Sequence, residues 1–158
     1  MIRYPIGDSG QTLVFHSHVV EHFLRYRQHY RWAKEAGGQL FAVFDQAEIK
    51  VIMSTGPRLT DQRTRYSYIP DRKVEQAEID YFYKKGLHFI GDWHTHAERV
   101  PVPSSNDLVN AKDCVVRSTH ALQGFVFVIV GTAPPPDGLF VGIALSDGIH
   151  PLVPPNPH

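Results

Sequence analysis

The stretch of sequence that decides the fold reads Gly91-Asp-Trp-His94-Thr-His96, then Ala97-Glu-Arg-Val-Pro-Val-Pro103, then Ser104-Ser-Asn-Asp107. The apolar run over 87–93 predicts a buried strand, and residues 104–118 predict a helix. Because side chains alternate along a strand, His94 and His96 should lie on one face. The Pro-rich connection can then fold Asp107 back toward the strand end. Two histidines and one carboxylate leave one position of a tetrahedral zinc open, which is typical of catalytic sites.

Outward from this stretch, the sequence predicts a mixed α/β domain. Further helices are expected from His18 to about Ala33, ended by Gly37-Gly38, and over 74–85. Strands are expected over 12–15, 40–44, 49–53, 87–93, 124–131 and 139–145. The alternating residues 65–69 could add an edge strand. The prediction is one domain over residues 1–150 with about six strands and three helices, followed by a loose Pro-rich tail over 151–158.

Composition narrows the class of protein. The chain has 158 residues, 42% apolar and 20% charged, which favours one globular domain. Sixteen Lys and Arg balance sixteen Asp and Glu, which argues against binding to nucleic acid or an anionic membrane. The single cysteine, Cys114, excludes a disulfide framework and a Cys-rich zinc site. Residues 1–5 do not resemble a signal peptide, and the longest apolar run, 124–131, is too short to span a bilayer. A cytoplasmic protein is therefore expected.

His94-Thr-His96, Ser104 and Asp107 have the spacing of the JAMM motif, so the chain resembles the JAB/MPN-domain metalloproteases. In that family an upstream glutamate near a glycine completes the site, and Glu35-Ala-Gly37-Gly38-Gln-Leu40 fits that place. The context Ile-Gly-Asp-Trp-His-Thr-His is similar to the prokaryotic JAB branch, which includes deconjugating proteases of bacterial antiphage (CBASS-like) operons. The resemblance runs from about the first helix to Leu145. It implies a single α/β (α+β) domain, with a mixed central sheet flanked by about three helices in a cytidine-deaminase-like layout.

The resemblance also implies a role for each motif residue. His94, His96 and Asp107 would hold Zn²⁺, Glu35 would be the general base, and Ser104 would hydrogen-bond the developing oxyanion. From the residues alone, Glu35 at the end of the expected helix opposes the helix dipole, which points mildly to function. A solvated helix-end glutamate is the alternative. Ser104 and Asp107 also fit a helix cap, and the two interpretations are compatible. One departure from many relatives is Ala97, where they carry proline.

Two rival sites are weaker. His18-Val-Val-Glu21-His22 is a formal H-x-x-E-H zinc-protease motif, but it lies on the polar face of the expected helix and should be solvated. Cys114 shares a helical face with Asp107 and Ala111, so we expect a partly buried core cysteine and not a nucleophile.

A basic cluster precedes the second helix. Its members are Arg58, Arg63, Arg65, Arg72 and Lys73. The cluster is either a solvated loop or a wall for an extended substrate tail. In the second interpretation Arg65, Tyr66 and Tyr68 bind substrate, and residues 65–69 provide a strand beside the tail.

The function that the resemblance implies is a zinc-dependent protease or isopeptidase of the JAMM type. It would cleave after the C-terminal tail of a ubiquitin-like or similarly conjugated protein, in antiphage defence. The expected partner is a ubiquitin-like tail or a conjugated cGAS-like nucleotidyltransferase, with no nucleic acid and no membrane. The alternatives are a non-catalytic JAB scaffold and a DNA-associated JAB protein similar to the RadC group.

Overall fold

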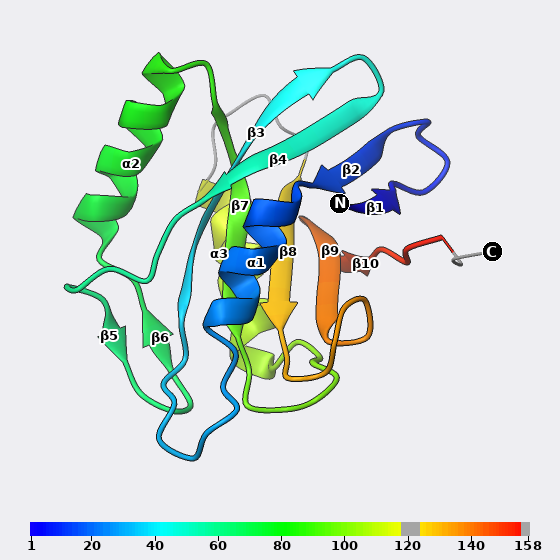
Figure 1. Cartoon of the computed structure of the whole chain (residues 1–158). Coiled ribbons are helices and arrows are strands. Elements are labelled where there is room, and N and C mark those ends of the chain that lie inside the picture. The colour runs from blue at the N-terminus through cyan, green and yellow to red at the C-terminus, as the bar shows by residue number, and fades with distance from the viewer. Residues whose placement is uncertain (118–123, 156–158) are drawn as a thin grey trace.

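A computed structural model describes residues 1–117 and 124–155 of the chain. Three helices, α1 (Ser17–Arg25), α2 (Arg72–Lys84) and α3 (Ser105–Arg117), flank a sheet of eight strands (Figure 1). In sheet order the strands are β1 (Ile2–Pro5), β2 (Thr12–Phe15), β4 (Glu48–Ser54), β3 (Gly37–Asp45), β7 (His88–Thr95), β8 (Phe125–Val130), β9 (Leu139–Leu145) and β10 (Gly148–Pro151). The predicted mixed α/β class is confirmed, and Ser118, the expected end of the third helix, lies outside the described residues.

The sheet is mixed, and β7 lies inside it. Strands β2 and β4 are parallel, as are β7 and β8, whereas the remaining neighbours are antiparallel. Strand β7 is hydrogen-bonded to β3 on one side and to β8 on the other. Residues at the end of β7 are therefore held on a backbone that is paired along both edges.

The two faces of β7 have different roles. The pairing of β3 with β7 skips Ile90, which acts as a bulge and resets the alternation of side chains. Beyond it, Trp93 and Thr95 are 1% and 0% exposed and belong to the interior. Asp92 and His94, which alternate with them, line a cleft on the other face. The bulge thus decides which residues of β7 face the cleft.

The core beneath α1 fixes β7 from the interior side. The Trp93 ring lies 5.1 Å from the Phe23 ring of α1, centroid to centroid, and 5.2 Å from the His22 ring. Its indole Nε1 donates a hydrogen bond of 2.9 Å to the carbonyl oxygen of Thr55. A buried tryptophan removes a large apolar area from water and satisfies its one donor here. A second apolar cluster packs against α3, with Cys114 partly buried at its edge, as predicted.

The first helix is shorter than predicted: it ends at Arg25 and not near Ala33. Beyond α1, side chains hold the chain in a non-helical path. Gln28 Nε2 donates to the Ala33 oxygen at 3.1 Å, and Arg65 Nη1, 35 residues away, donates to the Tyr30 oxygen at 2.7 Å. Because Arg65 is brought there by the tertiary structure, helical periodicity in the sequence was an incomplete guide.

Gly37 and Gly38 do not end a helix, as the sequence suggested, but begin β3. A Cβ atom at Gly38 would lie 1.7 Å from the carbonyl oxygen of Thr55, and one at Gly37 would lie 2.6 Å from that of Trp93. Both positions therefore need glycine because backbone approaches them closely.

Residues 65–69 do not form an edge strand of the main sheet. Instead β5 (Gln62–Arg63) and β6 (Tyr68–Ile69) make a separate two-stranded hairpin. Together with β1 and β10, this hairpin raises the strand number in the described residues to ten, where about six were expected. Strand β10 extends through Pro151, and the boundary after residue 150 stays a prediction. Within the described part of the chain, no helix has the length and apolar character needed to cross a membrane.

Candidate active site

Three candidate metal ligands converge at the end of β7. His94 lies on β7, His96 follows its last residue, and Asp107 lies in the first turn of α3. The Nε2 atoms of the two histidines are 3.1 Å apart, and each lies 3.1 Å from one carboxylate oxygen of Asp107. Ligand atoms 2.0–2.1 Å from a tetrahedral zinc are separated by about 3.3–3.4 Å. The three donors thus fit one face of a tetrahedral zinc site.

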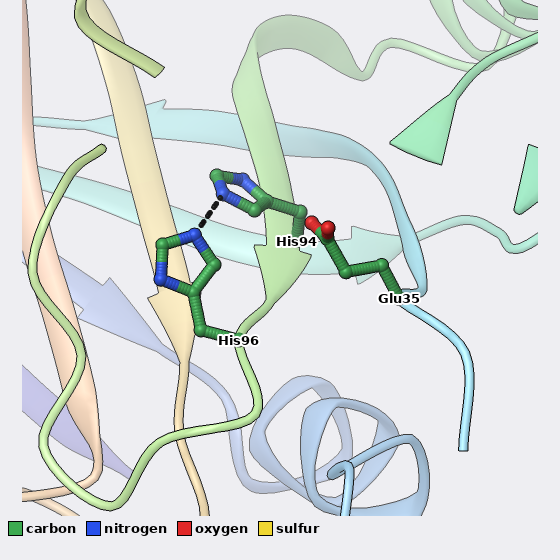
Figure 2. Close-up of side chains that lie close together, drawn as sticks. All are labelled: Glu35, His94 and His96. Carbon is green, nitrogen blue, oxygen red and sulfur yellow. Dashed lines mark hydrogen bonds between the residues drawn. The ribbon is translucent and has the colours of Figure 1, made fainter. Parts of the chain in front are cut away.

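Glu35 reaches the same cluster from the segment before β3 (Figure 2). Its side chain offers an oxygen within 4.8 Å of the ligand nitrogens of His94 and His96, and the residue is 8% exposed. Asp107 contacts the two nitrogens through different carboxylate oxygens, so both Asp107 and Glu35 are candidates for the third ligand position. Burial raises the pKa of Glu35, against the opposing effect of the two histidines. A buried carboxylate beside a group of candidate metal ligands suits a general base.

The backbone of Glu35 is held by the β5–β6 hairpin. Its N–H donates to the Thr64 oxygen at 2.7 Å, and its carbonyl accepts from Arg63 Nε at 2.7 Å. Because α1 ends at Arg25, the expected conflict between Glu35 and a helix dipole does not exist. The hairpin fixes the position of Glu35 instead.

Gln28 joins this segment to β7, and no sequence pattern predicted that role. The residue is 3% exposed. Its Oε1 accepts from the Thr95 hydroxyl at 2.8 Å, and its Nε2 donates to the Arg65 oxygen at 2.9 Å. The Thr95 oxygen in turn accepts from the Ala36 N–H at 2.9 Å. One buried amide therefore ties together β7, the Glu35 segment and the hairpin.

Glu98 is a second residue whose role the sequence analysis did not assign. Its Oε1 lies 2.9 Å from Nδ1 of His96 and also accepts from the Val102 N–H at 3.0 Å. A carboxylate on Nδ1 favours the tautomer in which Nε2 is available to a metal. Burial lowers the pKa of His96, but the hydrogen bonds that its ring donates to the carboxylates of Asp107 and Glu98 raise it to about 9. The sequence feature that could have predicted this role is an acidic residue two positions after His96.

Ser104 caps α3, which is the alternative left open by the sequence. Its Oγ accepts from the Asp107 N–H at 3.1 Å, and its own N–H donates to Asp107 Oδ2 at 2.8 Å. This reciprocal cap orients the carboxylate that faces His94 and His96. Burial alone would raise the pKa of Asp107, yet hydrogen bonds to the two histidines hold it far below its ordinary value. Ser104 also lines the cleft.

The site opens into a cleft of about 870 Å³, a size typical of ligand sites. Arg65, Tyr66 and Tyr68, the predicted substrate residues, line it together with Arg72. The Tyr68 hydroxyl donates to Asp61 at 2.9 Å and accepts from Arg58 at 3.0 Å. Of the basic cluster, Arg63 binds the Glu35 carbonyl and Arg58 lies inside the structure.

Arg58 is therefore neither solvated nor part of a substrate wall. Its guanidinium forms an ion pair with Glu78, and Nη1 of the same group lies 3.6 Å from Oδ2 of Asp61. Farther along the cleft floor, burial raises the pKa of Asp92 to about 7, and the charge of Glu75 acts in the same direction.

The rival H-x-x-E-H motif is solvated at His18 and Glu21, as predicted, but not at His22. His22 is half-buried, and its two ring nitrogens lie 2.5 Å from Ser54 Oγ and 2.7 Å from the Gly56 oxygen. His18 is exposed and contacts the Ile52 oxygen. Since both nitrogens of His22 are already engaged, this histidine has a packing role against Trp93.

Sequence comparison identifies related proteins. The chain is 39% identical over 71 residues to a protein named "Probable metalloprotease y4qB" from Sinorhizobium fredii, covering 42% of this chain and 43% of that one. It is 29% identical over 103 residues to a "CD-NTase/cGAS isopeptidase" from Vibrio cholerae, with 63% and 66% coverage. A protein of the same name from Escherichia coli is 27% identical over 129 residues, with 80% coverage of both. The chain thus spans less than two thirds of the first two relatives.

Structural comparison agrees on the fold. The solution structure of protein DSY2949 from Desulfitobacterium hafniense superposes with a TM-score of 0.63, covering 88% of both chains at 19% identity. The family description "Prokaryotic homologs of the JAB domain" matches residues 16–141, which include every residue of the cluster. These relatives support protease activity at the level of the family. The chain belongs to the prokaryotic JAB family.

Proposed function

We propose that this chain is a zinc-dependent protease that hydrolyses the bond after the C-terminal tail of a ubiquitin-like or similarly conjugated protein. The observation that supports this most directly is the convergence of His94, His96 and Asp107, with donors 3.1 Å apart and Glu35 beside them. Family membership and the names of the relatives favour the same chemistry.

The donor set fits zinc, since two imidazoles and a carboxylate are common ligands of catalytic zinc. When bound, zinc would supply Lewis-acid polarisation of the scissile carbonyl and a more acidic water. Glu35 would accept the proton of the attacking water and deliver it to the departing amine. Ser104 would donate its hydroxyl hydrogen to the developing oxyanion while its backbone N–H keeps Asp107 in place. Glu98 would hold His96 in the tautomer that binds metal through Nε2.

The substrate is inferred from the relatives. Two of them are named CD-NTase/cGAS isopeptidase, at 29% and 27% identity. We therefore propose a conjugated cGAS-like nucleotidyltransferase as the first substrate to test, with a ubiquitin-like tail as the second. A role in antiphage defence in the cytoplasm is carried over from the family resemblance and is part of the proposal.

Glu35→Gln tests the proposal. The variant keeps the shape of the side chain but cannot accept a proton, and Glu35 is not a ligand in this assignment. Zinc content and folding should survive, whereas cleavage of a tail fusion should fall by about 100- to 10,000-fold. Substrate capture by the variant should persist. Elemental analysis, circular dichroism, a gel-based cleavage assay and a pull-down of the tail fusion measure these four outcomes.

Glu21→Gln is the matched control, because Glu21 belongs to the rival motif and is exposed. It should cleave as fast as the wild type. Equal cleavage by Glu35→Gln would show that another group is the base, and Glu98 would be tested next. If the zinc-loaded wild type binds both kinds of conjugate and cuts neither, a non-catalytic scaffold is the better assignment.

A further inference from the structure

The segment between α1 and β3 exposes two aromatic rings that the proposed mechanism does not use. The side chains of Tyr30 and Trp32 are 61% and 78% exposed. Their rings are stacked, with centroids 5.2 Å apart and planes 8° from parallel. The pair therefore presents one continuous apolar surface to water. Tryptophan and tyrosine are enriched among the residues that contribute most to protein–protein binding, where such rings are buried against a partner.

The same segment is basic and contains no acidic residue. Residues 26–34 include Arg27, Arg31 and Lys34 and no Asp or Glu. None of the ion pairs found in the described part of the chain includes any of these three side chains. Arg31 and Lys34 are exposed, as the two rings are. Because the whole chain has a net charge of zero, this positive charge is a local excess, and it favours an anionic partner.

Arg65 joins this segment to the cleft. Its Nη1 donates to the carbonyl oxygens of Tyr30 and Arg31, both at 2.7 Å, and the residue also lines the cleft. In Figure 1 the chain that follows α1 accordingly lies beside the β5–β6 hairpin. The surface at this rim of the cleft, called the aromatic–basic patch below, consists of Arg27, Tyr30, Arg31, Trp32, Lys34 and Arg65. A protein whose tail lies in the cleft has this patch within reach of the rest of its chain.

We propose that the aromatic–basic patch is a docking surface for an acidic face of the substrate protein, in which an apolar side chain among the acids covers Tyr30 and Trp32. The inference rests on the proposed function for the partner's being a protein, and on the exposed rings and cations for its chemistry. Protein interfaces commonly have such an apolar centre with a polar rim. The rings would supply affinity, and the cations would speed association and select partners by charge.

The test measures binding at Trp32, so it does not depend on cleavage. The chain contains 2 tryptophans, and Trp93 is buried with its indole N–H bonded to the Thr55 oxygen. The two indole N–H signals in a nitrogen-15 NMR spectrum therefore report on the patch and on the interior separately. Trp32→Ala assigns them, because it removes one of the two.

The probe is an acetylated decapeptide amide with three glutamates on each side of a phenylalanine–leucine pair and a glycine at each end. Its matched partner has glutamine in place of every glutamate. Titrated into the zinc-loaded full chain at low salt, the acidic peptide should shift the Trp32 signal and leave the Trp93 signal in place. It should bind at least about tenfold more tightly than the glutamine peptide, as several exposed ion pairs acting together imply, and added salt should reduce this preference.

Charge-reversal variants assign the preference to the patch. Arg31→Glu combined with Lys34→Glu should weaken binding of the acidic peptide at least about tenfold. Lys84→Glu combined with Lys85→Glu is the matched control, because it makes the same change in net charge at two exposed lysines at the end of α2. The control should keep the affinity of the wild type. An unchanged Trp93 signal in both proteins would show that the interior is intact.

A ring-deletion variant tests the apolar centre. Trp32→Ala should also weaken binding about tenfold, measured by fluorescence anisotropy of a labelled acidic peptide. Tyr83→Ala, which removes an exposed ring of α2, is the matched control and should bind as the wild type does.

The outcomes separate this proposal from the proposed function. Equal binding of the glutamate and glutamine peptides would overturn the docking surface, as would binding that survives in both patch variants. A twelve-residue oligothymidylate that binds at least as tightly as the acidic peptide would overturn it in favour of single-stranded nucleic acid, which also uses exposed rings and cations. Charge-dependent binding at Trp32 supports the docking surface even if no conjugate is ever cleaved. Cleavage of a tail fusion by a chain that does not bind the acidic peptide would support the proposed function and overturn the docking surface alone.

Discussion

The two halves of the candidate site are assembled in different ways. The metal half comes from one stretch, residues 94–107, in which Glu98 and Ser104 orient the ligands through short-range hydrogen bonds. The base half, which consists of Glu35 with the β5–β6 hairpin and Gln28, joins segments that are far apart in sequence. Gln28 bonds to Arg65, 37 residues away, and to Thr95, 67 residues away. The metal half therefore depends on local sequence, and the base half depends on the completed tertiary structure.

The largest expected effect comes from removing a ligand in the metal half. His96→Ala deletes one of three converging donors, so the purified protein should contain little zinc and have no cleavage activity. Elemental analysis of the purified variant measures the loss. His18→Ala, which removes the exposed histidine of the rival motif, should retain the metal. Zinc that stays in His96→Ala but leaves His18→Ala would move the metal centre to α1.

A smaller effect is expected at Ser104, where the cap and the proposed oxyanion contact must be separated. Ser104→Ala removes both, whereas Ser104→Gly removes the hydroxyl and weakens the cap by only a few tenths of a kcal/mol. Loss of an oxyanion donor typically slows turnover by about 100- to 1000-fold. Both variants should therefore lose activity to a similar extent and keep zinc. A glycine variant that retains near wild-type turnover would leave Ser104 as a cap alone.

The metal half was predicted well from the sequence because it is assembled by local interactions. The H-x-H spacing and the helix start at Ser104 brought the ligands to one place, because strand period and helix capping are local rules. The boundaries of β9 also agree with the prediction, since a short apolar run ended by turns leaves little choice. The assignment of the cluster as a zinc site stays a prediction until metal is measured.

The base half was predicted less well for a physical reason. Tyr26 and Tyr30 continue the helical period beyond Arg25, but the carbonyls that follow are bonded to Gln28 and Arg65. No local pattern shows that a glutamine will be buried. The positions of Glu35 and the hairpin depend on long-range bonds such as that of Arg65. The helix-dipole argument for Glu35 relied on a helix that ends at Arg25, so the family resemblance was the one valid pointer to Glu35.

The smallest effect is expected from replacing Gln28, which links the segments of the base half. Gln28→Leu keeps the side-chain volume but leaves the carbonyls of Ala33 and Arg65 without their donor. Both hydrogen bonds are part-buried, and losing such a bond costs about 1 kcal/mol, so the free energy of unfolding in urea should fall by about 1–3 kcal/mol. Because Gln28 contacts the metal half only through the Thr95 hydroxyl and none of the three ligands, zinc should stay bound while turnover declines through a misplaced Glu35. Gln62→Leu, at an exposed glutamine of the same hairpin, should change neither quantity.

A double-mutant cycle decides whether Gln28 acts through Thr95. Thr95→Val removes the hydroxyl that donates to Gln28 and accepts from the Ala36 N–H. If the two side chains form one network, the destabilisation of the double variant should differ from the sum of the single variants by about 0.5–3 kcal/mol. Turnover should follow the same pattern at constant zinc content. Additivity within about 0.5 kcal/mol would mean that Gln28 supports the hairpin alone, and that the two halves of the site are held independently.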